Sequence, residues 1–277
     1  MKKAVLLLLA LCMVLAGCGG GEPDQIQAPE TTPAAPGVKT VYVHESITRT
    51  DTAGVHRTQY VYNEKNILSG VVIYDGQDQE VQRYQVVCDE YGNPQEWTTS
   101  MEGMTSSIAY RFDNQGHTLG TYAYSGDTLV TSTEYTWSGD LRISNTVKAV
   151  AQNFEQRIEY TYDENQRLIR QDQYSNGELS AYAICTCDDQ GRLISSKAYD
   201  LEGNHTSTIA STYDGSTETR VTTQANGVVV QTQTMTYDDA GNLLTSVFTD
   251  GEGNTLSSET HTWIAIEVPE DSPRASI

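Results

Sequence analysis

Apolar and polar residues alternate along most of this chain, in short stretches that end at turn residues. In residues 157–162, one side of an extended chain carries Ile158, Tyr160 and Tyr162. The opposite side carries Arg157, Glu159 and Thr161. A period of two, built from tyrosine, threonine, valine and isoleucine, is typical of β-strands. We therefore expect an all-β protein.

The strand pattern itself repeats about every 25 positions. Each repeat contains one aromatic residue or cysteine that is usually followed by an aspartate and a turn. These nine positions, which we call the anchors, are Tyr62, Cys88, Phe112, Trp137, Tyr162, Cys187, Tyr213, Tyr237 and Trp263. A fixed period of this length indicates an architecture that stacks one supersecondary unit.

Each repeat contains two turn signals. The first follows the anchor, as in Asp188-Asp189-Gln190-Gly191, and the second lies mid-repeat, as in Asn176-Gly177. Aspartate caps such turns with its side chain and glycine supplies the positive φ. The sequence thus predicts an antiparallel meander of two-strand hairpin units, about 16 to 18 strands in all. A sheet of this size curls, so we expect a spiral or barrel-like sheet over residues 39–266, with aromatic side chains inside and threonine, glutamine and glutamate outside.

The phrase that best shows the repeat is Tyr162-Asp163-Glu164-Asn165-Gln166-Arg167-Leu168, and a second copy begins at Tyr237-Asp238. It resembles the YD repeat of the RHS family, and the resemblance extends over roughly residues 40–265. In that family, meanders of β-strands coil into hollow shells. The resemblance implies the same kind of fold here.

The N-terminus has the features of an export signal. Lys2 and Lys3 precede an apolar stretch from Ala4 to Ala16, which is too short to cross a bilayer as a helix. The stretch ends in Leu15-Ala16-Gly17-Cys18, which resembles the bacterial lipobox. The resemblance implies cleavage of residues 1–17 and lipidation (palmitate and diacylglycerol) at Cys18. An ordinary secretory peptide with a chance cysteine is the alternative.

The segments that flank the predicted sheet differ from it in composition. Residues 18–38 are rich in glycine, proline and threonine and predict a flexible tether. Residues 267–277 predict a disordered tail. Together with Cys18, the tether places the folded domain on the extracytoplasmic face of the cell membrane.

The chain is strongly acidic, with a formal net charge of −20 that becomes about −22 without Lys2 and Lys3. This charge argues against a nucleic-acid partner and against adhesion to anionic lipid. Beyond the leader and Cys18, the cysteines are Cys88, Cys185 and Cys187. An odd, small number predicts no disulfide framework, and we interpret them as small core residues.

Motifs for catalysis are absent from the sequence, which has no HExxH, GxSxG or P-loop. Its repeated aspartates occupy one structural position in successive turns, so we expect no enzyme and no cofactor. Two loops begin with the oxygen ligands of a calcium loop at positions 1, 3 and 5. These weak calcium candidates are Asp200, Glu202, Asn204, Asp250, Glu252 and Asn254.

Two aromatic residues break the repeat and are predicted ligand contacts at the surface. They are Tyr91, in a turn, and Trp97, which is off the register of the anchors. The sequence favours a membrane-anchored surface lipoprotein whose β-repeat domain is a non-enzymatic binding or structural module for a protein or an envelope glycan. An immunity or antitoxin-like lipoprotein and an enzyme acting on cell-surface polymer remain the alternatives.

Overall fold

The computed structural model describes residues 37–101, 103–270 and 272. These residues form eighteen β-strands and one short 3-10 helix, η1 (Val150–Gln152). The strands are β1 (Val38–Asp51), β2 (Gly54–Tyr62), β3 (Leu68–Tyr74), β4 (Glu80–Cys88), β5 (Pro94–Met101), β6 (Met104–Phe112), β7 (Thr118–Ser125), β8 (Thr128–Ser138), β9 (Leu141–Ala149), β10 (Phe154–Tyr162), β11 (Leu168–Ser175), β12 (Glu178–Cys187), β13 (Leu193–Tyr199), β14 (His205–Asp214), β15 (Thr217–Gln224), β16 (Val229–Tyr237), β17 (Leu243–Asp250) and β18 (Thr255–Pro269).

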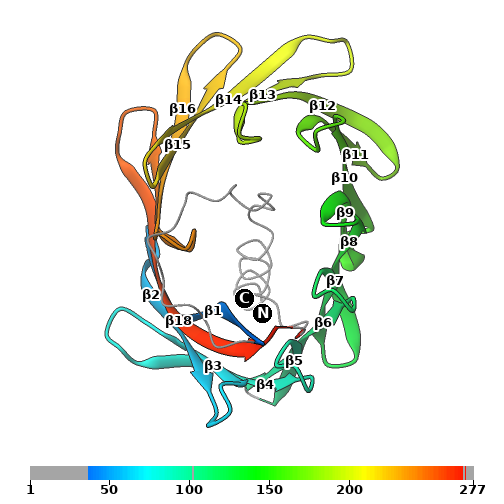
Figure 1. Ribbon diagram of the computed structural model, residues 1–277. Coiled ribbons are helices and arrows are strands. Elements are labelled where there is room, and N and C mark those ends of the chain that lie inside the picture. The colour runs from blue at the N-terminus through cyan, green and yellow to red at the C-terminus, as the bar shows by residue number, and fades with distance from the viewer. Residues whose placement is uncertain (1–36, 102, 271, 273–277) are drawn as a thin grey trace.

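Every strand pairs antiparallel with its neighbours in the sequence, and β1 also pairs with β18. The meander therefore closes into a barrel, which appears as a ring in Figure 1. The predicted all-β hairpin meander is confirmed, and of the two shapes expected from the sequence the closed one is found. Closure also removes the unpaired edges that an open sheet would expose, except on the β1–β18 ribbon described below.

The turn after six of the nine anchors is built around one aspartate or asparagine. In the β4–β5 turn, Oδ1 of Asp89 accepts hydrogen bonds from the backbone N–H groups of Tyr91 and Asn93, both at 2.9 Å. Gly92 has a φ of 92°, the left-handed region that glycine adopts without steric cost. The β10–β11 turn repeats this geometry at Asp163, with Gln166 at a φ of 63° in the place of glycine.

Most anchors fasten their strand to the backbone near the start of an earlier strand. Tyr162, for example, donates its hydroxyl hydrogen to the carbonyl of Arg142 at 2.8 Å. Seven anchors make such a bond to the carbonyl of a residue 18 to 20 positions earlier: Tyr62, Cys88, Trp137, Tyr162, Cys187, Tyr213 and Trp263. The shared property of tyrosine, tryptophan and cysteine at these positions is a hydrogen-bond donor. Cys88 and Cys187 are thus half-buried donors, whereas Cys185 is buried.

The first and last strands, β1 and β18, form a two-stranded ribbon, and its position shows which face of the sheet is the inner one. Up to His44, the partners of β1 belong to β18, and after a bulge before Ser46 β1 pairs with both β18 and β2. Ribbon residues Val41, Val43, Ile266 and Val268 are buried and pack against the anchor Tyr62. Because the ribbon lies within the ring in Figure 1, the anchor side chains face inward, as the sequence predicted. The ribbon continues to Pro269, three residues beyond the predicted end of the domain.

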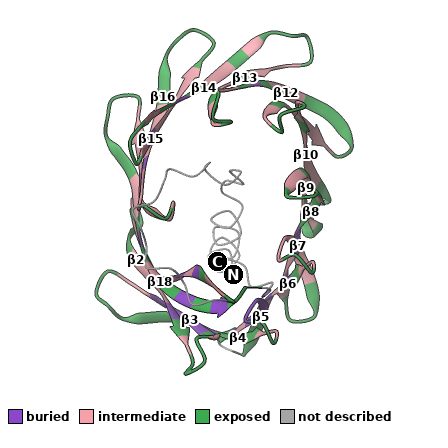
Figure 2. Cartoon of the chain, in the orientation of Figure 1, coloured by how far each residue is buried: buried purple, intermediate pink, exposed green. Residues whose placement is uncertain are grey.

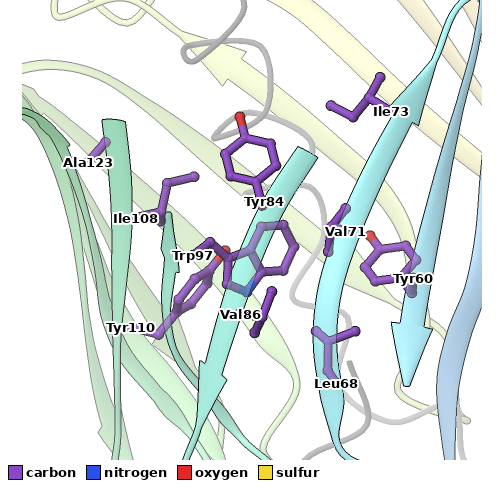
Figure 3. Packing of buried hydrophobic residues seen from close by; sticks show 10 residues of the cluster. All are labelled: Tyr60, Leu68, Val71, Ile73, Tyr84, Val86, Trp97, Ile108, Tyr110 and Ala123. Atoms are coloured by element: carbon purple, nitrogen blue, oxygen red, sulfur yellow. The ribbon is translucent and has the colours of Figure 1, made fainter. Parts of the chain in front are cut away.

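The inner face has an apolar wall and a polar wall. The apolar wall spans β2 to β7, where Figure 2 shows buried residues along β3 to β5. Its buried residues, shown in Figure 3, are Tyr60, Leu68, Val71, Ile73, Tyr84, Val86, Trp97, Ile108, Tyr110 and Ala123. On β10 to β17, the same face carries half-buried glutamines, because Gln171 pairs opposite the inward Tyr160 and Gln173 opposite the inward Ile158. The expectation that glutamine faces outward is therefore wrong for this wall.

Candidate functional site

A pocket of about 410 Å³ lies at the rim of the barrel, between the β4–β5 turn and the β6–β7 turn. This volume falls within the range of small-molecule sites. We call it the rim pocket. Its lining residues are Asp89, Tyr91, Asn93, Gln95, Arg111, Phe112, Asp113 and Asn114.

The two carboxylates of the rim pocket are engaged in building their own turns. Besides its two backbone bonds, Asp89 accepts from Nδ2 of Asn93 at 3.2 Å. Asp113 accepts from the backbone N–H groups of Gln115 and His117 and is bonded to Nδ1 of His117, each at 2.9 Å. Burial disfavours the charge of Asp113, but these hydrogen bonds outweigh it and lower the pKa of the carboxyl.

His117 ties the pocket's second turn to the next hairpin. Its ring stacks on Trp137 with centroids 4.7 Å apart, and its Nε2 lies 3.4 Å from a carboxylate oxygen of Asp140 in the β8–β9 turn. In the other Asx-capped anchor turns the equivalent residue is arginine, asparagine or isoleucine, for example Arg167, Asn242 and Ile67. Of the two anchor turns that form the pocket, the β6–β7 turn uses histidine and the β4–β5 turn uses asparagine.

Two side chains of the rim pocket, Tyr91 and Arg111, are exposed and make few contacts with other side chains. Tyr91 is 47% exposed at the tip of its turn, where the sequence predicted a ligand contact. Arg111 is exposed and makes one long hydrogen bond, 3.5 Å, to the hydroxyl of Tyr122, with no ion pair among the described residues. Sequence reasoning missed Arg111 because nothing in its local pattern distinguishes it from the other outward arginines.

Trp97, the second predicted ligand contact, lies elsewhere and is not at the surface. It is 3% exposed in the apolar wall, opposite Val86 on β4 and Ile108 on β6. A register shift beside Cys88 restores Trp97 to the inward side, which is why counting from the anchors misplaced it. Its ring packs against the rings of Tyr60, Tyr84 and Tyr110, and its indole nitrogen is buried without a hydrogen-bond partner among the described residues. A role in ligand contact stays a prediction.

The two candidate calcium loops have the geometry of the anchor turns. In the loop at 200–204, Oδ1 of Asp200 accepts from the backbone N–H of Asn204 and Oδ2 accepts from Nδ2 of Asn204. The loop at 250–254 repeats both bonds between Asp250 and Asn254. These hydrogen bonds, led by the one from the asparagine side chain, lower the pKa of both aspartates. Glu202 and Glu252 complete the two candidate sets, and calcium binding there stays a prediction.

The described part of the chain contains no group of three or more His, Cys, Asp and Glu side chains that is arranged to hold a metal ion. Within the same residues, no helix has the length and apolar character needed to cross a bilayer. The predicted leader 1–17, Cys18 and most of the tether 18–38 lie outside the described residues.

Comparison with known proteins gives distant similarities. Residues 62–190 match the model of a family described as "Uncharacterised protein". A comparison with curated proteins finds no match.

Among solved structures, the chain is similar to the TcdB2-TccC3-Cdc42 complex, with 12% identity, a TM-score of 0.33 and coverage of 79% of this chain and 18% of the other. It is also similar to porin-like proteins from Bacteroides uniformis (10% identity, TM-score 0.35, covering 80% and 96%) and Bacteroides vulgatus (9% identity, TM-score 0.34, covering 80% and 98%). The chain spans less than a fifth of the matched chain in the TcdB2-TccC3-Cdc42 structure. These values assign neither a family nor a function.

Proposed function

We propose that this protein is a lipid-anchored surface lipoprotein whose barrel is a non-enzymatic binding module for a protein or an envelope glycan. The observation that carries the proposal is the rim pocket, because it contains the exposed Tyr91 and the exposed guanidinium of Arg111, which makes one long hydrogen bond and no ion pair among the described residues. Side chains that the fold does not use are available to a ligand.

Closure of the barrel supports binding through side chains. An open sheet captures partners by adding a strand to its edge, and closure leaves such edges only on the β1–β18 ribbon among the described strands, at Val38–His44 and Trp263–Pro269. The turns at the rim project beyond the strands, so ligand contacts on this scaffold belong there.

The membrane anchor rests on the leader residues Lys2 to Cys18. The Cys18→Ala variant is expected to leave the membrane fraction and appear in the soluble fraction, because the two acyl chains that hold the protein are lost. Membrane fractionation with immunoblotting measures this. Continued sedimentation of Cys18→Ala with membranes would contradict the anchor.

The binding role is tested by retention on protein and glycan arrays. We expect the Tyr91→Ala variant to lose most of the retained signal, since Tyr91 is the exposed large hydrophobic residue of the lining. Phe154→Ala is the matched control, because Phe154 is an aromatic residue 42% exposed outside the pocket lining. If the wild type retains no ligand of any kind, the binding function is wrong.

A further inference from the structure

We infer that the rim pocket binds a neutral, polyhydroxylated glycan unit. This inference rests on the proposed binding function and names its ligand. The chemistry of the lining residues eliminates the other classes one at a time.

A cationic ligand is disfavoured because the pocket's carboxylates are already occupied. The Oδ1 atoms of Asp89 and Asp113 each accept two backbone hydrogen bonds, and each Oδ2 is bonded to a side chain, Asn93 or His117. A lysine or ammonium group would have to displace these bonds, and both turns depend on them.

An anionic ligand is disfavoured by charge. Arg111 is the single lysine or arginine in the lining, and Asp89 and Asp113 line the same pocket. The chain as a whole carries a formal charge of −20, so its field repels anions on approach.

The remaining groups suit hydroxyl groups on a flat ring. Gln95 and Asn114 each offer an amide donor and an amide acceptor, and neither makes a side-chain hydrogen bond among the described residues. Arg111 adds donors in a fixed plane. Tyr91 makes no ring stacking contact with another described residue, so its face is available to the apolar face of a sugar ring. A pyranose presents these two features together, hydroxyl groups around its edge and C–H groups on its face.

The test is calorimetric titration of the full chain with five probes. Cellopentaose, maltopentaose and chitopentaose are neutral, an oligogalacturonate is anionic, and pentalysine is cationic. At least one neutral oligosaccharide is expected to bind, and Tyr91→Ala and Arg111→Ala are each expected to weaken it by about tenfold. Phe154→Ala and Arg83→Ala are the controls and should leave its affinity within about twofold, because neither residue lines the pocket. Circular dichroism of each variant confirms that the sheet is intact.

The outcomes separate the inference from the proposed function. If the anionic or cationic probe, or a protein on the array, binds in a Tyr91-dependent manner and the neutral oligosaccharides do not, the glycan assignment is wrong and the binding function stands. If a neutral oligosaccharide binds but the control variants weaken it as much as the pocket variants do, the site is wrong. If nothing is retained from any class, both proposals fail.

Discussion

The two walls of the barrel share one backbone plan and differ in what covers their inner face. On β2 to β7, the inner side chains form one cluster of buried apolar and aromatic residues, including Val71, Trp97 and Ile108. On β10 to β17, the corresponding positions include the half-buried Gln171 and Gln173. Both walls nevertheless keep similar strand lengths, of 7 to 9 residues in β2 to β7 and 7 to 10 residues in β10 to β17, and both have bulges and aspartate turns.

This difference shows that the closed ring of strands, which we call the frame, does not need an apolar core along its whole circumference. The elements common to both walls are the anchor hydrogen bonds and the turn aspartates. Tyr62 on the apolar side and Tyr162 on the polar side each donate to a backbone carbonyl, at 2.7 Å and 2.8 Å. The frame is therefore local and polar, and apolar packing is added to it on one side.

The largest expected effect comes from a cavity in the apolar wall. Ile108→Ala should lower the free energy of unfolding by about 2–5 kcal/mol, because Ile108 is 1% exposed and its lost contacts are not replaced. Gln173→Ala, at a half-buried position of the polar wall, should cost about 0.5 kcal/mol or less. Urea unfolding of both variants measures the contrast. Equal losses would show that the two walls do not differ energetically.

An intermediate and equal effect is expected for the shared frame. Tyr62→Phe and Tyr162→Phe should each cost about 1 kcal/mol, since each removes one hydroxyl donor to a partly buried carbonyl. Urea unfolding again provides the measurement. A cost on the apolar side alone would mean that the anchor bond matters only where a core supports it.

The smallest effect for each residue is expected from the turn aspartates on the polar side. Hydrogen bonds lower the folded-state pKa of Asp163, Asp200 and Asp250, with a backbone N–H as the largest cause for Asp163 and an asparagine side chain for the other two. Because the folded-state pKa is lower than the unfolded pKa of about 3.9, each ionised aspartate stabilises the folded state above that pH. This stabilisation is lost as the pH falls through the folded-state pKa. The urea midpoint should therefore fall between about pH 5 and pH 2.

The triple variant Asp163→Asn, Asp200→Asn, Asp250→Asn tests the source of this acid sensitivity. Asparagine keeps an oxygen acceptor for the turn and does not titrate. The slope of the urea midpoint against pH should become shallower in the triple variant. An unchanged slope would assign the acid sensitivity to other carboxylates.

The sequence predicted the strands and turns because their signals are local. Residues two apart set the faces, as at Ile158 and Tyr160, and an aspartate or asparagine, usually with a following glycine, sets most turns. Local signals could not predict that the sheet closes, because closure brings together residues that are far apart in the sequence. His44 and His261 are an example, with ring nitrogens 3.2 Å apart. The sequence contains no local mark of that pairing.

The candidate site was predicted only in part, for two physical reasons. Tyr91 interrupts a turn whose other residues are explained, so it was recognisable as an exception. Trp97 was misplaced because one bulge reverses which residues face inward. Arg111 was missed because its distinguishing feature, the lack of an ion pair among the described residues, is a property of the fold.

Phe112 is the one anchor whose side chain has no hydrogen-bond donor, and it lines the rim pocket. Its turn is tied forward through His117 to Asp140. Substitutions at Phe112 and in the turn after it therefore remove none of the seven side chains that donate the anchor hydrogen bonds. Over evolutionary time, the turn after Phe112 could therefore change its residues while the rest of the ring is inherited unchanged.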